Sequence, residues 1–251
     1  MPWIVILGCL LLWQGAVRLL AIQAFILPAP TDIFDALLQY RGPIFASALF
    51  TLANTLSGFA IGIAVGVVLG MIIGTSRLAY AGLYPLLVGL NSVPKAAIVP
   101  ILVLWMGIGQ PPAITTAFLL SFFPITVNVA TGLATTEPEL EDVLRSLGAT
   151  RLDILRKVGI PRSLPYFFAS LKVSITLAFV GAVISETLAS NDGIGYLMVQ
   201  AASQFRTPLM FAGVSVIAAM GIATYVIFVI IEQRFTGWAT RKNTIAVSGG
   251  G

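Results

Sequence analysis

The sequence predicts an all-α membrane protein with six transmembrane helices, folded as a single domain over residues 1–251. Hydrophobic residues make up 58% of the chain and charged residues only 10%, and the mean hydropathy is +0.98. A soluble domain is about one quarter charged because its surface faces water, so this composition excludes a soluble fold. It also excludes a disordered chain, because disordered chains are polar and rich in charge.

Six stretches have the length and composition of membrane-spanning helices. A helix needs about 20 mostly apolar residues to cross the hydrocarbon core of a bilayer. The first stretch has neither a basic leading segment nor a convincing cleavage site, so it is predicted to be a span rather than a signal peptide. Arg18 within it would extend toward the nearer interface. The predicted spans are residues 3–22, 47–73, 80–106, 113–131, 166–187 and 210–231.

The positive charges predict how the chain is oriented. With the N-terminus inside, the outer loops hold only Arg41 and Arg206. Cytoplasmic loops carry an excess of Lys and Arg, so both termini are predicted to be cytoplasmic. The inner side then holds Arg77, Arg145, Arg151, Arg156, Lys157, Arg162, Arg234, Arg241 and Lys242.

The composition also excludes several kinds of chemistry. The chain has no histidine, so zinc sites built on histidine and Ser-His-Asp triads are ruled out, and no metal site is expected. The single cysteine, Cys9, lies in an apolar run and is predicted to act as a small hydrophobic residue. The net charge of +4 is explained by membrane orientation, so we expect membrane lipid and no nucleic acid as a partner.

The inner loop at residues 132–165 is the most charged part of the chain, and it reads as helical. Thr150 followed by Asp153 is a capping-box pattern, which marks the start of a helix. Apolar residues at helical spacing lie on both sides of Gly148. The loop is therefore predicted to form two short amphipathic helices hinged at this glycine. Periodicity alone allows them either to dock a cytoplasmic protein or to lie on the membrane surface.

Polar residues within the spans are candidates for the lining of a translocation path. The third predicted span contains Lys95, and a charge in the bilayer costs several kcal/mol, so it marks a functional site by default. Alternatively, Lys95 neutralises Glu186 in a structural ion pair. The path candidates are Asn91, Ser92, Lys95, Ser121, Asn128 and Glu186.

Five glycines recur at every fourth position of the second predicted span. Such a stripe removes side-chain bulk from one helix face and allows close packing against a neighbouring helix. Helix packing is favoured over a moving gate. The glycines are Gly58, Gly62, Gly66, Gly70 and Gly74.

The inner loop resembles the "EAA" loop of ABC-importer permeases. That pattern is Glu-Ala-Ala, three residues, Gly, nine residues and then Ile-x-Leu-Pro. Here the spacing is kept from Asp142 to Gly148 and on to Val158-Gly159-Ile160-Pro161. Asp142 replaces the Glu, and Val143-Leu144 replace the two alanines. The stretches 27–30, 104–109 and 186–197 resemble the nitrate/sulfonate/taurine subfamily of these permeases.

The resemblance implies a type I ABC-importer permease fold in a bacterial inner membrane. It also implies a homodimer around the path, two cytoplasmic ABC ATPases beneath it and an extracytoplasmic solute-binding protein. The chain has no G-x-x-x-x-G-K-[ST] phosphate loop, so ATP and Mg are expected on the partner ATPase, with no cofactor and no enzyme activity on this chain. The ATPase-coupling residues would be Asp142, Arg145, Gly148, Arg151, Arg156, Ile160 and Pro161.

The expected cargo is a small anion such as a sulfonate, taurine or nitrate, because Lys95 would favour negative charge and the subfamily resemblance agrees. The alternative cargo is a pyrimidine-type vitamin precursor.

Two other functional classes fit the sequence less well than a permease does. A passive channel would have no use for a charged inner loop with this spacing. An aspartyl intramembrane protease would need two aspartates within the spans.

Overall fold

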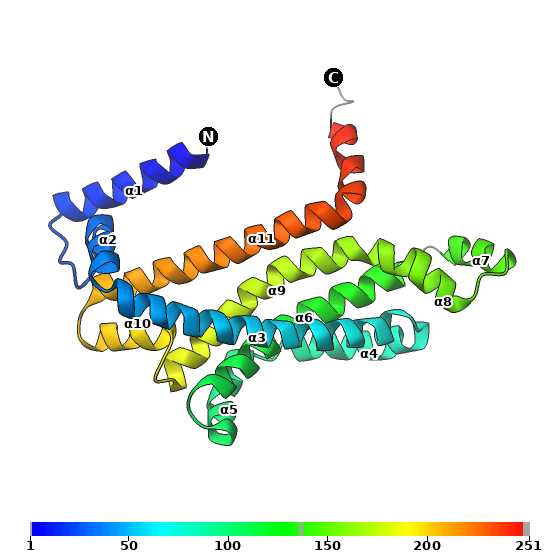
Figure 1. Ribbon diagram of the computed structural model, residues 1–251, viewed down its shortest axis with the longest axis horizontal. Helices are drawn as coiled ribbons and strands as arrows, with labels where there is room; N and C mark the ends of the chain where they lie inside the picture. The colour runs from blue at the N-terminus through cyan, green and yellow to red at the C-terminus, as the bar shows by residue number, and fades with distance from the viewer. Residues whose placement is uncertain (1, 136–137, 248–251) are drawn as a thin grey trace.

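The computed structural model describes residues 2–135 and 138–247, and within these ranges the chain forms helices and no strand. Its centre is built from α3 (Arg41–Gly74), α6 (Gln110–Ala134) and α9 (Ile160–Ala189), which lie side by side (Figure 1). The outermost long helix, α11 (Thr207–Val247), packs on α9. The shared core includes Phe59, Ile125, Val129, Ile175 and Phe179. The predicted all-α class is confirmed.

Four described helices are long and apolar enough to cross a membrane, and a bent pair of helices would make a fifth span. The four contain the predicted second, fourth, fifth and sixth spans. They are Arg41–Gly74, Gln110–Ala134, Arg151–Ala189 and Thr207–Thr236.

The third predicted span, which the sequence shows to be interrupted by Pro85, Pro94 and Pro100, is not one continuous helix. It consists of α4 (Arg77–Asn91), a 3-10 turn η1 (Lys95–Ile98) and α5 (Val99–Met106), with a bend of 74°. The break falls at Pro94, which has no N–H to donate and disfavours helical backbone in the residue before it.

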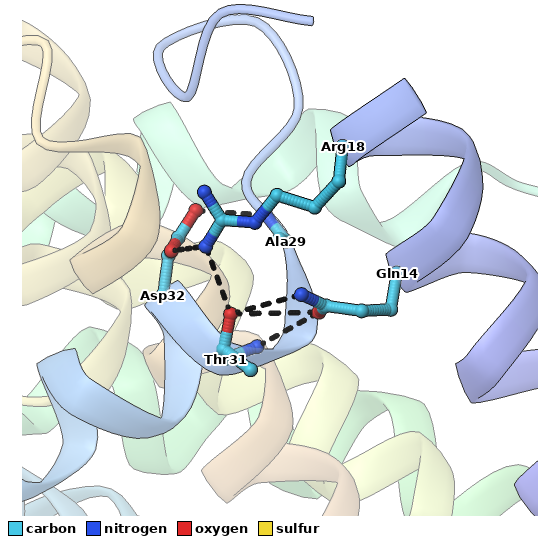
Figure 2. A network of polar contacts seen from close by, with 5 residues as sticks. All are labelled: Gln14, Arg18, Ala29, Thr31 and Asp32. Atoms are coloured by element: carbon cyan, nitrogen blue, oxygen red, sulfur yellow. Dashed lines mark hydrogen bonds and ion pairs between the residues drawn. The ribbon is translucent and has the colours of Figure 1, made fainter. Parts of the chain in front are cut away.

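The first predicted span corresponds to α1 (Pro2–Leu19), an apolar helix of 18 residues. Arg18 does more than extend toward an interface, because it pairs with Asp32 at 2.7 Å. Thr31 accepts hydrogen bonds from both Arg18 and Gln14, so α1 is fastened to the next helix through polar contacts (Figure 2).

The two ends of the bundle carry different short helices (Figure 1). At one end lie α2 (Pro30–Gln39) and α10 (Ile194–Ser203), held to α3 and α11 by a second apolar cluster. At the other end lie α7 (Pro138–Ser146) and α8 (Arg151–Ile154). Residues 136 and 137 of the predicted inner loop lie outside the described residues.

Candidate coupling loop and translocation path

In the inner loop one short helix, α7, ends just before Gly148, and α8 begins shortly after it as the first turn of the long helix Arg151–Ala189. The prediction of two short helices is therefore correct for the first and corrected for the second. The backbone of Gly148 has φ +84°, a left-handed conformation that L side chains rarely adopt. Its N–H donates to the carbonyl of Arg145, and the N–H of Ala149 donates to that of Leu144. This is the Schellman arrangement that ends a helix at a glycine. The predicted hinge is therefore confirmed, and its physical cause is a helix C-terminus.

The second loop helix, α8, begins with the predicted capping box. The Thr150 hydroxyl accepts from the N–H of Asp153, and the Asp153 carboxylate accepts from the N–H of Thr150, both at 3.2 Å. These two bonds satisfy N–H groups that a helix start otherwise leaves free. The capping fixes the direction in which α8 leaves Gly148.

A widened π-helical turn, η2 (Leu155–Gly159), joins α8 to α9 and was not predicted. Pro161 lies two residues after the end of this turn. Its ring excludes the carbonyl four residues earlier from a regular helical hydrogen bond, so the turn before it widens. Helix Arg151–Ala189 nevertheless runs as a single span-length unit of 39 residues. The coupling candidates Ile160 and Pro161 thus lie within this helix, at its junction with the loop.

The loop surface combines cations with exposed apolar side chains. Arg151 and Arg156 are exposed, as are Asp142 and Arg145 on the first loop helix. Leu147 is 78% exposed, beside Gly148. Val143 and Leu152 are also exposed. A surface that exposes both cations and apolar side chains is suited to docking another protein.

Three path candidates meet where the third predicted span breaks. Asn91 and Ser92 are exposed at the end of α4. The Lys95 ammonium donates to the backbone carbonyl of Asn91 at 3.0 Å and to its Oδ1 at 2.7 Å. The ammonium also lies 4.7 Å from the centre of the Phe123 ring. An ammonium has three hydrogens, so one remains for a further acceptor.

Two other candidates bond to their own helix, α6. Ser121 is fully buried and donates to the carbonyl of Phe118, while half-buried Asn128 donates to that of Pro124. A Cβ on Gly62 would lie 2.5 Å from Ser121 Oγ. Ser121 is therefore covered by α3 and does not line an open path, contrary to the sequence prediction.

Glu186 is also inside the subunit, with only 1% of it exposed. Its carboxyl group accepts hydrogen bonds from Thr51 Oγ1 at 2.8 Å, Asn54 Nδ2 at 3.2 Å and the N–H of Gly195 at 3.2 Å. The predicted alternative, an ion pair with Lys95, is wrong, because these two described residues have other partners. Thr51 and Asn54 were missed in the sequence analysis. They could have been found as polar residues within the otherwise apolar second span.

The glycine stripe of α3 lies against α6 along its whole length. A Cβ on Gly58 would lie 2.4 Å from the carbonyl oxygen of Ile114, and one on Gly74 would lie 2.7 Å from that of Ala130. Gly62, Gly66 and Gly70 have comparably close neighbours on α6. The backbones of these two helices can approach this closely only because these positions lack side chains.

An apolar cavity of about 520 Å³ lies between α9 and α11. Its lining includes Phe179, Val183, Ile217, Gly221 and Tyr225 and none of the path candidates. Because it offers so few polar groups, it does not fit a small polar solute.

Comparison with known proteins decides the family. Residues 62–237 match the model of the family described as "Binding-protein-dependent transport system inner membrane component". The chain belongs to this family. It is therefore a permease subunit of an ABC importer.

Similar permeases include proteins named for different solutes. The formylaminopyrimidine transport permease protein ThiX of Halalkalibacterium halodurans is 30% identical over 96% of both chains. The riboflavin transport system permease protein RibX of Chloroflexus aurantiacus is 35% identical over 91% of this chain and 86% of its own. The putative aliphatic sulfonates transport permease protein SsuC of Escherichia coli is 29% identical over 94% and 91%.

The permease fold also matches a solved structure. A chain of the MetNI methionine ABC transporter, in an inward-facing conformation, superposes with a TM-score of 0.68 at 18% identity. The match covers 79% of this permease and 98% of the MetNI chain. It confirms the type I ABC-importer permease fold.

Proposed function

We propose that this permease is driven by two cytoplasmic ATPases, each docking on the loop from α7 through Gly148 to α8. The observation that supports this most is the exposed basic and apolar loop surface at one end of helix Arg151–Ala189. Closure of the ATPases on nucleotide would displace this loop and, with it, the helix. ATP and Mg would be bound by the ATPases.

The same proposal includes a second copy of the permease, with the translocation path between the two copies. The exposed break at Asn91, Ser92 and Lys95 would then face the path. An extracytoplasmic solute-binding protein would deliver solute at the opposite end from the loop, where α2 and α10 lie (Figure 1). The excess of Lys and Arg on the loop side supports cytoplasmic termini in a bacterial inner membrane.

The proposed cargo is a small anion such as a sulfonate, taurine or nitrate. Lys95 supports this choice because Asn91 holds its ammonium with one hydrogen still available to an anionic oxygen. The relative named for aliphatic sulfonates agrees. A pyrimidine-type vitamin precursor is the second candidate, supported by the relative named for formylaminopyrimidine, which aligns over 96% of both chains.

Uptake into proteoliposomes tests the cargo. The permease, its ATPase and its solute-binding protein would be reconstituted and supplied in turn with taurine, nitrate and formylaminopyrimidine. If an anion is the cargo, Lys95→Gln lowers its uptake about tenfold, because a hydrogen bond to a charged group is lost. Arg41→Gln removes an exposed charge elsewhere and leaves uptake unchanged. Uptake of formylaminopyrimidine alone, indifferent to Lys95, would favour the second candidate.

A further inference from the structure

The carboxyl group of Glu186 lies at the start of α10, a helix to which it does not belong. The first N–H groups of a helix have no partner within it, and the residue before the helix usually supplies one from its side chain. Here that residue is Gly193, which has no side chain. Glu186 of α9 accepts from the N–H of Gly195 instead. Thr51 of α3 accepts from the N–H of Ile194 at 2.9 Å and donates to Glu186.

The space around this carboxyl group is closed. Gly193 has φ +96°, and a Cβ there would lie 2.4 Å from the carboxyl carbon of Glu186. A Cβ on Gly195 would lie 2.7 Å from the Glu186 Cβ. Both glycines are thus required for the carboxyl group to reach the start of α10. The start of this helix is fitted to a side chain from another helix.

A carboxyl group suits this position for two reasons. The N-terminus of a helix carries a partial positive charge, which attracts a negative group. Glu186 can also accept several hydrogen bonds at once, and Asn54 provides the third. Among the residues that the structure describes, no lysine or arginine lies within ion-pair distance of Glu186, so α10 itself is the principal electrostatic partner.

The helix that carries Glu186 begins at the coupling loop. Helix Arg151–Ala189 has 39 residues, which corresponds to about 58 Å at 1.5 Å per residue. Arg151 and Arg156 lie at its loop end, and Glu186 lies one turn from its other end. Half of its most apolar stretch is buried, chiefly against α6. One continuous element therefore joins the loop surface to α10.

We propose that Glu186 is a positioning residue that fastens α10 to α9 and α3, so that a displacement of the coupling loop is transmitted to α10 at the opposite end of the subunit. This inference rests on the proposed function, in which the loop is displaced by an ATPase. It assigns Glu186 to transmission within the subunit and not to contact with solute.

Amide hydrogen exchange in the assembled transporter tests this proposal. The complex of permease and ATPases would be measured in lipid nanodiscs, without nucleotide and with MgATP plus vanadate. The variants are Glu186→Ala, Glu186→Gln and Thr51→Val, which replaces a hydroxyl by a methyl group. Asp35→Asn, which removes an exposed carboxylate at the same end of the bundle, is the matched control.

In the wild type we expect exchange to respond to nucleotide both in residues 142–158 and in residues 194–200. Glu186→Ala should speed exchange in 194–200 about tenfold or more and abolish its nucleotide response, while 142–158 still responds. A purely structural defect would alter both segments. Glu186→Gln should retain most of the protection, since its amide oxygen can accept from Gly195. Thr51→Val should speed exchange at Ile194 in particular.

The proposal is overturned if residues 194–200 of Glu186→Ala exchange within twofold of the wild type or still respond to nucleotide. Failure of the proposed function would give another result. If no ATPase displaces the loop, exchange in residues 142–158 of the wild type does not respond to nucleotide, but Glu186→Ala still speeds exchange in α10 because the cap is lost.

Discussion

The ammonium nitrogen of Lys172 lies 2.6 Å from Oε2 of Glu232, and this ion pair joins α9 to α11. The two side chains are only 20% and 16% exposed, so water screens the pair weakly. Because α9 begins at the coupling loop, the pair ties the outermost long helix to the element that would carry the ATPase signal.

Breaking this pair on one side should destabilise the permease. Glu232→Gln leaves the Lys172 ammonium poorly compensated in a mostly buried position, which costs a few kcal/mol. We expect the apparent Tm of the purified permease to fall by several degrees, and the double variant Lys172→Met, Glu232→Met to recover most of the loss. A single variant that melts like the wild type would show that the pair contributes nothing.

The glycine stripe predicts a position-specific penalty for added bulk. In Gly70→Ala the new Cβ would lie 2.7 Å from the Cβ of Val129, so α3 and α6 must separate or repack, at a cost of about 1–3 kcal/mol. Gly221→Ala is the control because nothing lies within 4 Å of its Cβ, and alanine favours a helix. Relative to the wild type, the Tm should fall in Gly70→Ala and should rise slightly in Gly221→Ala. An equal fall of the Tm in both variants would refute close packing as the reason for the stripe.

The left-handed backbone at Gly148 predicts which residues can replace it. A valine there is strained by about 1–2 kcal/mol and should turn α8 away from its position after α7. Asparagine tolerates left-handed backbone and should substitute with little loss. We expect solute uptake per ATP hydrolysed to fall about tenfold in Gly148→Val and to stay near wild type in Gly148→Asn. If both variants lose coupling equally, the backbone conformation is not what matters.

The capping box at the start of α8 can be tested by exchanging its hydroxyl. Thr150→Ala removes the acceptor for the Asp153 N–H and should cost about 1 kcal/mol, or roughly a fivefold rise in local amide exchange. Thr150→Ser keeps the hydroxyl and should restore slow exchange. Fast exchange in the serine variant would indicate that the threonine methyl group, and not the cap, protects α8.

Local sequence signals predicted much of this fold because their causes are local. Composition and apolar length identified most of the spans, and the spacing from Thr150 to Asp153 identified the start of α8. The same signals did not show at which proline the helix of the third span breaks. Pro85 is accommodated within α4, whereas Pro94 ends the helical run, and the sequence around each proline does not distinguish the two outcomes.

The polar candidates could not be sorted from the sequence because their partners are distant along the chain. Glu186 is 135 residues from Thr51 and 132 from Asn54, so no local pattern pairs them. Ser121 is buried because the backbone of α3 passes close over its hydroxyl group at Gly62, a residue on another helix. α10 carried a usable signal in the helical spacing of Ile194, Leu197 and Ala201, but its capping by Glu186 depends on tertiary structure.

The central claim is that the loop around Gly148 docks an ATPase. Its most direct test is to co-express the permease with the ATPase encoded beside it, purify the complex in mild detergent and measure its mass. We predict two permeases with two ATPases for the wild type and for the control Arg41→Glu, Arg206→Glu, which reverses two exposed charges outside the loop. Reversal within the loop, Arg151→Glu with Arg156→Glu, should release the ATPases. A wild-type permease that purifies alone, or a loop variant that keeps both ATPases, would contradict the account.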